Sequence, residues 1–231
     1  GNADGIEGEE MSGGLICGKE EHVHTEECYD PKIMLLAEGY VDGGDWWELS
    51  QDGVLSIHIP EGEGPGATMA MADYGGGGAP WYKYREQITS VVIGEGVTGI
   101  GSAFYACAKL SNVGLPDGME KIGSGAFRGC TSLEAIHLPE GMKAIENIAF
   151  SECSKLSNVK LPDGMEEIGS GAFEECASLE TIELPEGIKK ISKDTFYNSG
   201  LKSVAIPESV ESIEQGAFGG CKSLSTVVIS P

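Results

Sequence analysis

Apolar residues recur along the second half of the chain in a fixed order, with polar residues between them. Leu133, Ile136 and Leu138 follow the spacing L-x-x-I-x-L. The alternation of apolar and polar residues at its end predicts a short strand with one buried face. A proline follows, and in segments such as Pro116-Asp117-Gly118 it is expected to open a tight turn.

This order returns every 22 or 23 residues. A leucine and a turn proline keep a constant offset from phenylalanines that are all in phase: Phe104, Phe127, Phe150, Phe173, Phe196 and Phe218. A unit this short cannot bury its own apolar residues, so neighbouring units must stack and share a core. We therefore predict a β-rich repeat solenoid over residues 88–231, with about six coils, a parallel sheet on one face and short return segments.

The segment 43–87 is predicted to cap the first coil, because an open coil would expose its core and a strand edge. Two apolar segments, 46–49 and 54–59, flank Asp52-Gly53, which is a hairpin signal. A glycine-rich loop follows the hairpin. The expected apolar cover consists of Trp46, Trp47 and Trp81.

The patterns L-x-x-V-x-L-P, I-G-x-x-A-F and C-x-x-L resemble the BspA-like, or Treponema-type, leucine-rich repeats of bacterial cell-surface proteins. The resemblance covers roughly residues 43–231, including the hairpin cap. It implies a right-handed leucine-rich-repeat coil, display on the cell surface, and contact with host proteins or other cells.

Charge narrows the choice of partners. The formal net charge is −22, and phosphate binding depends on clustered Lys and Arg, so we expect no nucleic-acid partner. The longest apolar run, 33–37, is far shorter than the ~20 residues of a membrane-spanning helix, so we expect no membrane insertion of this segment. We expect an exported monomer whose signal peptide is absent from this sequence.

Residues 1–14 are acidic and glycine-rich and are expected to form a flexible tail, followed by a Cys/His box and linker over residues 15–42. Cys17, His22, His24 and Cys28 make up a ligand set for a tetrahedral structural zinc. The alternatives are a Cys17–Cys28 disulfide, as in exported proteins, or free thiols. No other cofactor is expected. The box also resembles short Cys/His elements in surface proteins of anaerobic gut bacteria.

Two further sets of residues recur in phase with the repeat, so each is expected to stack in a column along the solenoid. We expect the in-phase cysteines to be buried free thiols, because parallel stacking does not supply disulfide geometry and Ser199 takes the slot in one unit; they are Cys107, Cys130, Cys153, Cys176 and Cys221. Acids after the turn prolines are expected to form a solvated edge, with a weak divalent-cation or basic-partner edge as the alternative; they are Asp117, Glu140, Asp163, Glu186 and Glu208.

Partner binding is expected on the outward positions of the predicted sheet, because the inward positions hold the core. The candidate residues are His137, Lys160, Glu183, Asn112, Asn158 and Thr181. This face has no Trp, Tyr or Arg, the usual anchors of a tight interface.

These observations support two functional hypotheses. The first is an extracellular binding or adhesion module without catalytic activity, whose partners are host or bacterial surface proteins or glycans. The second is a structural spacer rod that presents another domain. An enzyme is a distant alternative, since no Ser or Cys is placed by sequence beside a His with an orienting third group.

Overall fold

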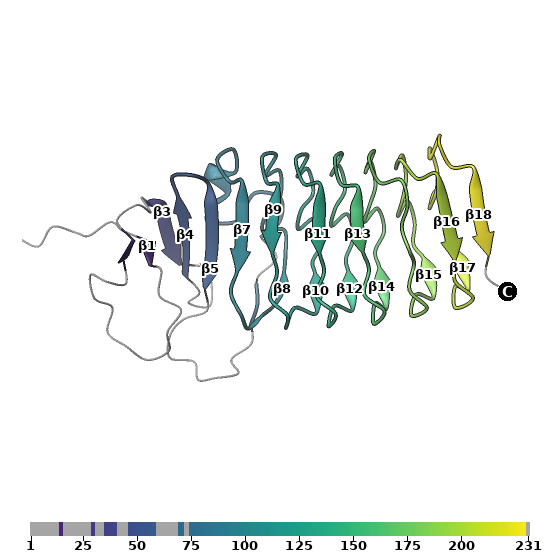
Figure 1. Cartoon of the computed structure of the whole chain (residues 1–231), viewed down its shortest axis with the longest axis horizontal. Coiled ribbons are helices and arrows are strands. Elements are labelled where there is room, and N and C mark those ends of the chain that lie inside the picture. Colours follow the sequence, from purple (N-terminus) through teal and green to yellow (C-terminus); the bar gives the residue numbers. More distant parts are fainter. Residues whose placement is uncertain are drawn as a thin grey trace, which may run out of the picture.

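A computed structural model describes residues 35–40, 46–58, 69–71 and 74–229, together with the backbone of strands β1 (Gly14–Leu15) and β2 (Tyr29–Asp30). The described chain forms a solenoid whose coils stack side by side along the long axis (Figure 1). It contains no α-helix in these ranges, only the 3-10 turn η2 (Tyr82–Tyr84). The predicted repeat solenoid is confirmed.

The strand of each repeat lies on what we call the long-strand face. It consists of β7 (Ser90–Ile93), β9 (Asn112–Gly114), β11 (Ala135–His137), β13 (Asn158–Lys160), residues 181–183, β16 (Ser203–Ile206) and β18 (Thr226–Ile229). The strands that pair on this face are parallel and in register, as in Ala135 opposite Asn158 and His137 opposite Lys160. In β11 and β13 the middle residues, Ile136 and Val159, are buried and the flanking residues are exposed, whereas all four residues of β18 in the last coil are exposed. The alternation predicted from the sequence is therefore present.

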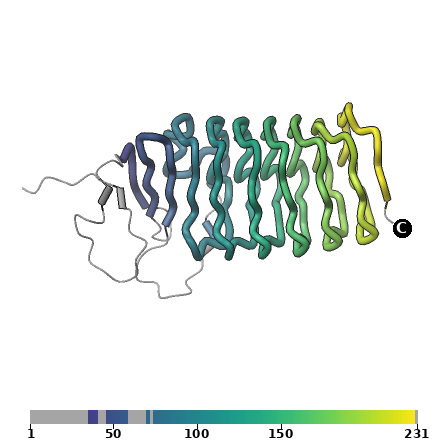
Figure 2. Tube along the Cα trace, viewed as in Figure 1, coloured from purple at the N-terminus to yellow at the C-terminus, as the bar shows by residue number. Residues whose placement is uncertain are grey.

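The return segments form a second parallel ladder that the sequence analysis did not predict. It contains β6 (Met69–Ala70), β8 (Val97–Ile100), β10 (Lys121–Ile122), β12 (Ala144–Ile145) and β14 (Glu167–Ile168), and β15 (Lys190–Ile191) pairs separately with β17 (Ser212–Ile213). Most of these strands are two residues long, too short to display a period of two in the sequence. The solenoid therefore has a parallel ladder on each of two faces (Figure 2).

The phenylalanines form one continuous stack that runs from coil to coil. Successive ring centroids lie 5.3–5.7 Å apart from Phe104 to Phe218, and Trp81 extends the stack with its ring 6.0 Å from that of Phe104. The Trp81 indole donates a hydrogen bond to the carbonyl of Ala103 at 2.8 Å. The phenylalanine column is thus core and not a ligand groove.

The cap is an antiparallel sheet of three strands, β3 (Leu35–Tyr40), β4 (Trp46–Ser50) and β5 (Val54–His58). The predicted hairpin is β4 and β5, and β5 then pairs in parallel with β7. Strand β3 falls within residues 15–42, where the sequence analysis expected only the box and linker. A Cβ at Gly39 would come within 2.9 Å of Trp47 Nε1, so the glycine lets β3 lie directly over that indole.

One detail of the predicted cap is wrong. Trp47 and Trp81 are buried and pack edge to face at 5.8 Å, whereas Trp46 lies outside the core and stacks on His58. Adjacent residues of a strand point to opposite faces, so Trp46 and Trp47 cannot both cover the core.

Candidate functional site

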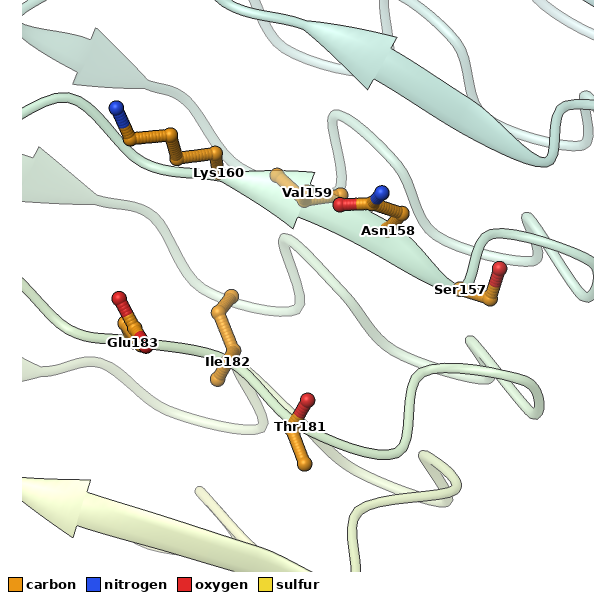
Figure 3. Close-up of a pocket in the computed structure, with 7 residues that line it drawn as sticks. All are labelled: Ser157, Asn158, Val159, Lys160, Thr181, Ile182 and Glu183. Carbon is orange, nitrogen blue, oxygen red and sulfur yellow. The ribbon is translucent and has the colours of Figure 1, made fainter.

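The long-strand face is interrupted in two places. No ladder connects β9 to β11, and none connects β13 to residues 181–183, which are joined to β16 only by an isolated bridge between Glu183 and Ala205. At the second interruption there is a shallow depression of about 240 Å³ (Figure 3). Its lining residues are Ser157, Asn158, Val159, Lys160, Thr181, Ile182 and Glu183.

The depression has an apolar floor and a polar rim. Val159 and Ile182 belong to the core cluster and are almost fully buried. The side chains of Asn158, Thr181 and Glu183 are exposed around them (Figure 3). An amide, a hydroxyl and a carboxylate together offer donors and acceptors to a polar ligand or to a peptide segment. The geometry suits a contact surface more than an enclosed pocket.

Lys160 and Glu183 contribute opposite charges to this rim. The ammonium of Lys160 lies 3.7 Å from Glu140 Oε1, and both side chains are about three-quarters exposed. An ion pair this exposed adds little to stability, so the lysine can exchange its partner for one on a ligand. Glu140 comes from the acidic column that follows the turn prolines, which places that column beside the rim.

The structure brings together four of the six predicted partner-binding residues. Asn158, Lys160, Thr181 and Glu183 line the depression, and His137 lies opposite Lys160 in the neighbouring strand. Asn112 lies on β9, beyond the other interruption of the face. Sequence reasoning missed Ser157, whose hydroxyl donates to the carbonyl of Glu134 at 3.3 Å. Ser157 lies 23 residues after Glu134 and directly before the outward positions of β13. This spacing is the sequence signal that could have identified it.

The in-phase cysteines are buried free thiols, as predicted, with Cys221 in the last coil partly exposed. Each thiol from Cys130 to Cys221 donates to the carbonyl of a phenylalanine in an adjacent coil, for example Cys153 Sγ to Phe127 O at 3.1 Å. Ser199 occupies the slot of the missing cysteine and lies 3.3 Å from Cys221 Sγ. Burial raises the pKa of the Cys107 and Cys153 thiols to about 12, so neither is a thiolate nucleophile at neutral pH.

The predicted metal ligands Cys17, His22, His24 and Cys28 lie outside the described residues. Within the described ranges, no three His, Cys, Asp or Glu side chains are placed to hold a metal ion. The acids that follow the turn prolines are all exposed there. In the part of the chain that the structure covers, no helix has the length and apolar character of a membrane span.

Comparison with known proteins agrees with this architecture. Six copies of the BspA type leucine rich repeat region match residues 80–200, more than half of the chain. The chain therefore belongs to the BspA-type leucine-rich repeat family. No curated protein matches it.

Solved structures of bacterial proteins share the fold. The chain is similar to a leucine rich cell surface protein from Faecalibacterium prausnitzii, with a TM-score of 0.65 and 30% identity over 82% of this chain and 54% of that protein. It is also similar to a leucine rich repeat protein from T. pallidum, with a TM-score of 0.54 and 27% identity over 79% of this chain and 78% of the other. A Bacteroides ovatus leucine-rich repeat protein, 24% identical over 86% of this chain and 53% of that one, shares the fold with a TM-score of 0.64. The chain spans about half the length of the F. prausnitzii and B. ovatus proteins.

Proposed function

We propose that this chain is a protein-binding module on a bacterial cell surface, and that its partner contacts the long-strand face at the depression beside β13. The observation that carries the proposal is the break between β13 and residues 181–183, where polar side chains surround an apolar floor. The family membership and the likeness to a F. prausnitzii cell surface protein support the location. The buried thiols with raised pKa speak against nucleophilic catalysis by these cysteines.

The test is binding of the purified chain to a panel of host matrix proteins, mucins, bacterial surface proteins and glycans at physiological salt. The variant Lys160→Ala/Glu183→Ala leaves net charge unchanged and removes both charges of the rim. The matched control Lys189→Ala/Glu211→Ala removes one lysine and one glutamate at exposed positions that precede the strands β15 and β17 of the other ladder.

Saturable binding to a protein that weakens at least ~10-fold in the rim variant and not in the control is the expected result. Equal weakening in both variants would assign binding to general electrostatics and overturn the proposal. Binding to glycans alone would replace the protein partner with a carbohydrate.

A spacer rod is the second candidate function. The outward positions of the repeats carry no Trp, Tyr or Arg, and the stacked rings form a continuous core from Trp81 to Phe218. Such a rod holds its two ends at a fixed separation without contacting a partner along its length. A chain that binds no component of the panel would favour this function.

A further inference from the structure

The outward face of the cap carries an ordered group of side chains that the repeats lack. Because the three strands pair in register, Tyr40, Trp46 and His58 form one row across β3, β4 and β5. Glu38, Glu48 and Ser56 form the adjacent row, since residues two apart in a strand share a face. We call these six residues the cap grid.

The two glutamates of the cap grid face each other across the β3–β4 pair. Like charges directly opposite in an antiparallel pair repel and are destabilising. Glu38 is exposed, but the side chain of Glu48 is only 10% exposed, and its Oε2 atom is buried with no hydrogen-bond partner. Within the described ranges no lysine or arginine pairs with either carboxylate. A buried carboxylate oxygen without a donor is costly, so this pair is set to accept a cation.

The neighbouring row supplies aromatic surface. Trp46 and His58 stack with centroids 5.4 Å apart and planes 29° from parallel, and Tyr40 is 75% exposed. His58 Nε2 lies 3.6 Å from Glu48 Oε1, too far for a hydrogen bond. The imidazole is 44% exposed, and its Nε2 atom is buried with no hydrogen-bond partner, so access of a ligand to the carboxylate requires this ring to turn aside.

We propose that the cap grid binds an arginine side chain of a partner protein. Guanidinium is planar and stacks on aromatic faces, and its fork of donors matches a carboxylate. Tyr40 and Trp46 would hold the plane of the guanidinium, while Glu48 and Glu38 receive its N–H donors. The net charge of −22 adds a general attraction for a basic segment. Lysine is a poorer fit, because a compact ammonium gains less from a flat ring surface beside two acceptors.

The arginine site rests on the proposed function, in which the chain is a protein-binding module. It adds the chemistry that the partner would present at a second place on the surface, the cap grid. Strand β5 pairs in register with β7, with Ser56 opposite Val92, so the cap grid continues the long-strand face. A partner lying along that face would meet aromatic anchors at the cap and polar contacts at the depression. Aromatic residues are the kind of anchor that dominates binding energy, and the outward positions of the repeats have none.

The test uses the full chain and a small probe, so that it does not require the natural partner. The peptide Gly-Arg-Gly is compared with Gly-citrulline-Gly, which keeps the shape and loses the charge, and with Gly-Lys-Gly. The readout is the indole N–H signal of Trp46 in nuclear magnetic resonance spectra. The chain has three tryptophans and the other two are buried in the core, so Trp46→Leu assigns this signal.

Saturable shifts of the Trp46 signal are expected with Gly-Arg-Gly, with affinity at least ~10-fold weaker for the citrulline peptide. Glu48→Gln and Tyr40→Leu should each weaken the arginine peptide by ~5-fold or more. Glu211→Gln, which makes the same charge change at an exposed position before β17, should leave its affinity unchanged. The folded state of each variant is checked by its thermal unfolding curve.

Absence of a saturable Trp46 shift, or equal affinity for the arginine and citrulline peptides, would overturn the proposal. Equal weakening by Glu211→Gln and Glu48→Gln would also overturn it, because it would reduce the effect to net charge. Failure of the arginine peptide to bind would not count against partner binding at the depression, because that site is tested with Lys160→Ala/Glu183→Ala against whole proteins. The two failures are therefore distinguishable.

Discussion

Phe150 and Phe173 stack with their ring centroids 5.5 Å apart and their planes 5° from parallel, although 23 positions separate them in the chain. Both rings are fully buried. Nearly parallel planes at this centroid distance are typical of a stacked aromatic pair. Each ring is therefore a contact between coils, and the column couples the stability of one coil to the next.

Replacing a ring in the middle of this column should cost more than replacing one at its end. We expect Phe150→Ala to lower the free energy of unfolding by about 3–5 kcal/mol, because it opens a cavity and removes two stacked neighbours. Phe218→Ala should cost clearly less, because Phe218 is only partly buried and stacks on one ring. Urea denaturation followed by circular dichroism measures both, with Phe150→Leu as the control that keeps most of the volume. Equal losses in the two alanine variants would contradict a coupled column.

The buried thiols make stability sensitive to alkaline pH. Burial raises the pKa of Cys153 to about 12, so the folded protein keeps this proton above pH 9, where the unfolded chain releases it. The stabilising contribution of the thiol is therefore present below pH 9 and is lost as the pH rises toward 12. In Cys153→Ala the decline of unfolding free energy between pH 9 and 10.5 should be less steep by about 1 kcal/mol per pH unit. An identical slope in the wild type and the variant would show that Cys153 is not buried in its protonated form.

A turn of each coil requires a left-handed backbone, which glycine adopts most easily. Gly129, Glu152 and Glu175 have φ of 77°, 64° and 58° at equivalent positions of successive repeats. Glu175 is exposed, so its replacement removes no packing. We expect Glu175→Gly to be about 1 kcal/mol more stable than Glu175→Ala, which also removes the charge but retains Cβ. Thermal unfolding of the pair isolates the backbone effect, and a more stable alanine variant would refute it.

The Cys/His box remains a prediction from the sequence. We expect about one zinc per chain, held by Cys17, His22, His24 and Cys28 as a closed structural site. Elemental analysis after purification without chelator measures the metal, and His22→Ala/His24→Ala should abolish it, whereas His137→Ala should not. A zinc-free wild-type chain whose Cys17 and Cys28 both resist alkylation would indicate the disulfide instead.

The repeat period in the sequence by itself determines most of the solenoid. Each repeat of 22 or 23 residues contains a leucine, a proline and a phenylalanine at fixed offsets. They identify the buried strand position, the turn and the core ring, because each depends on local sequence and recurs in phase. Ser199 takes the place of a cysteine in one repeat, and a serine cannot form a disulfide. The sequence therefore indicates that the in-phase cysteines pack in the core and do not form disulfides. The outward positions followed from the alternation of the strand, so Asn158, Lys160, Thr181 and Glu183 could be named as exposed candidates.

The tertiary structure decided where the face is interrupted and what covers the cap. The break beside Lys160 depends on how far neighbouring coils separate, which is not encoded in any single repeat. The two-residue return strands and β3 have sequence patterns too short or too weak to predict, and pairing with neighbours defines them. The apolar segment beside the hairpin signal predicts Trp46 as part of the apolar cover with Trp47, but the pleat of β4 places it beside His58 instead. Local pattern thus determines which residues are buried in a repeat, whereas register between strands determines which exposed residues meet.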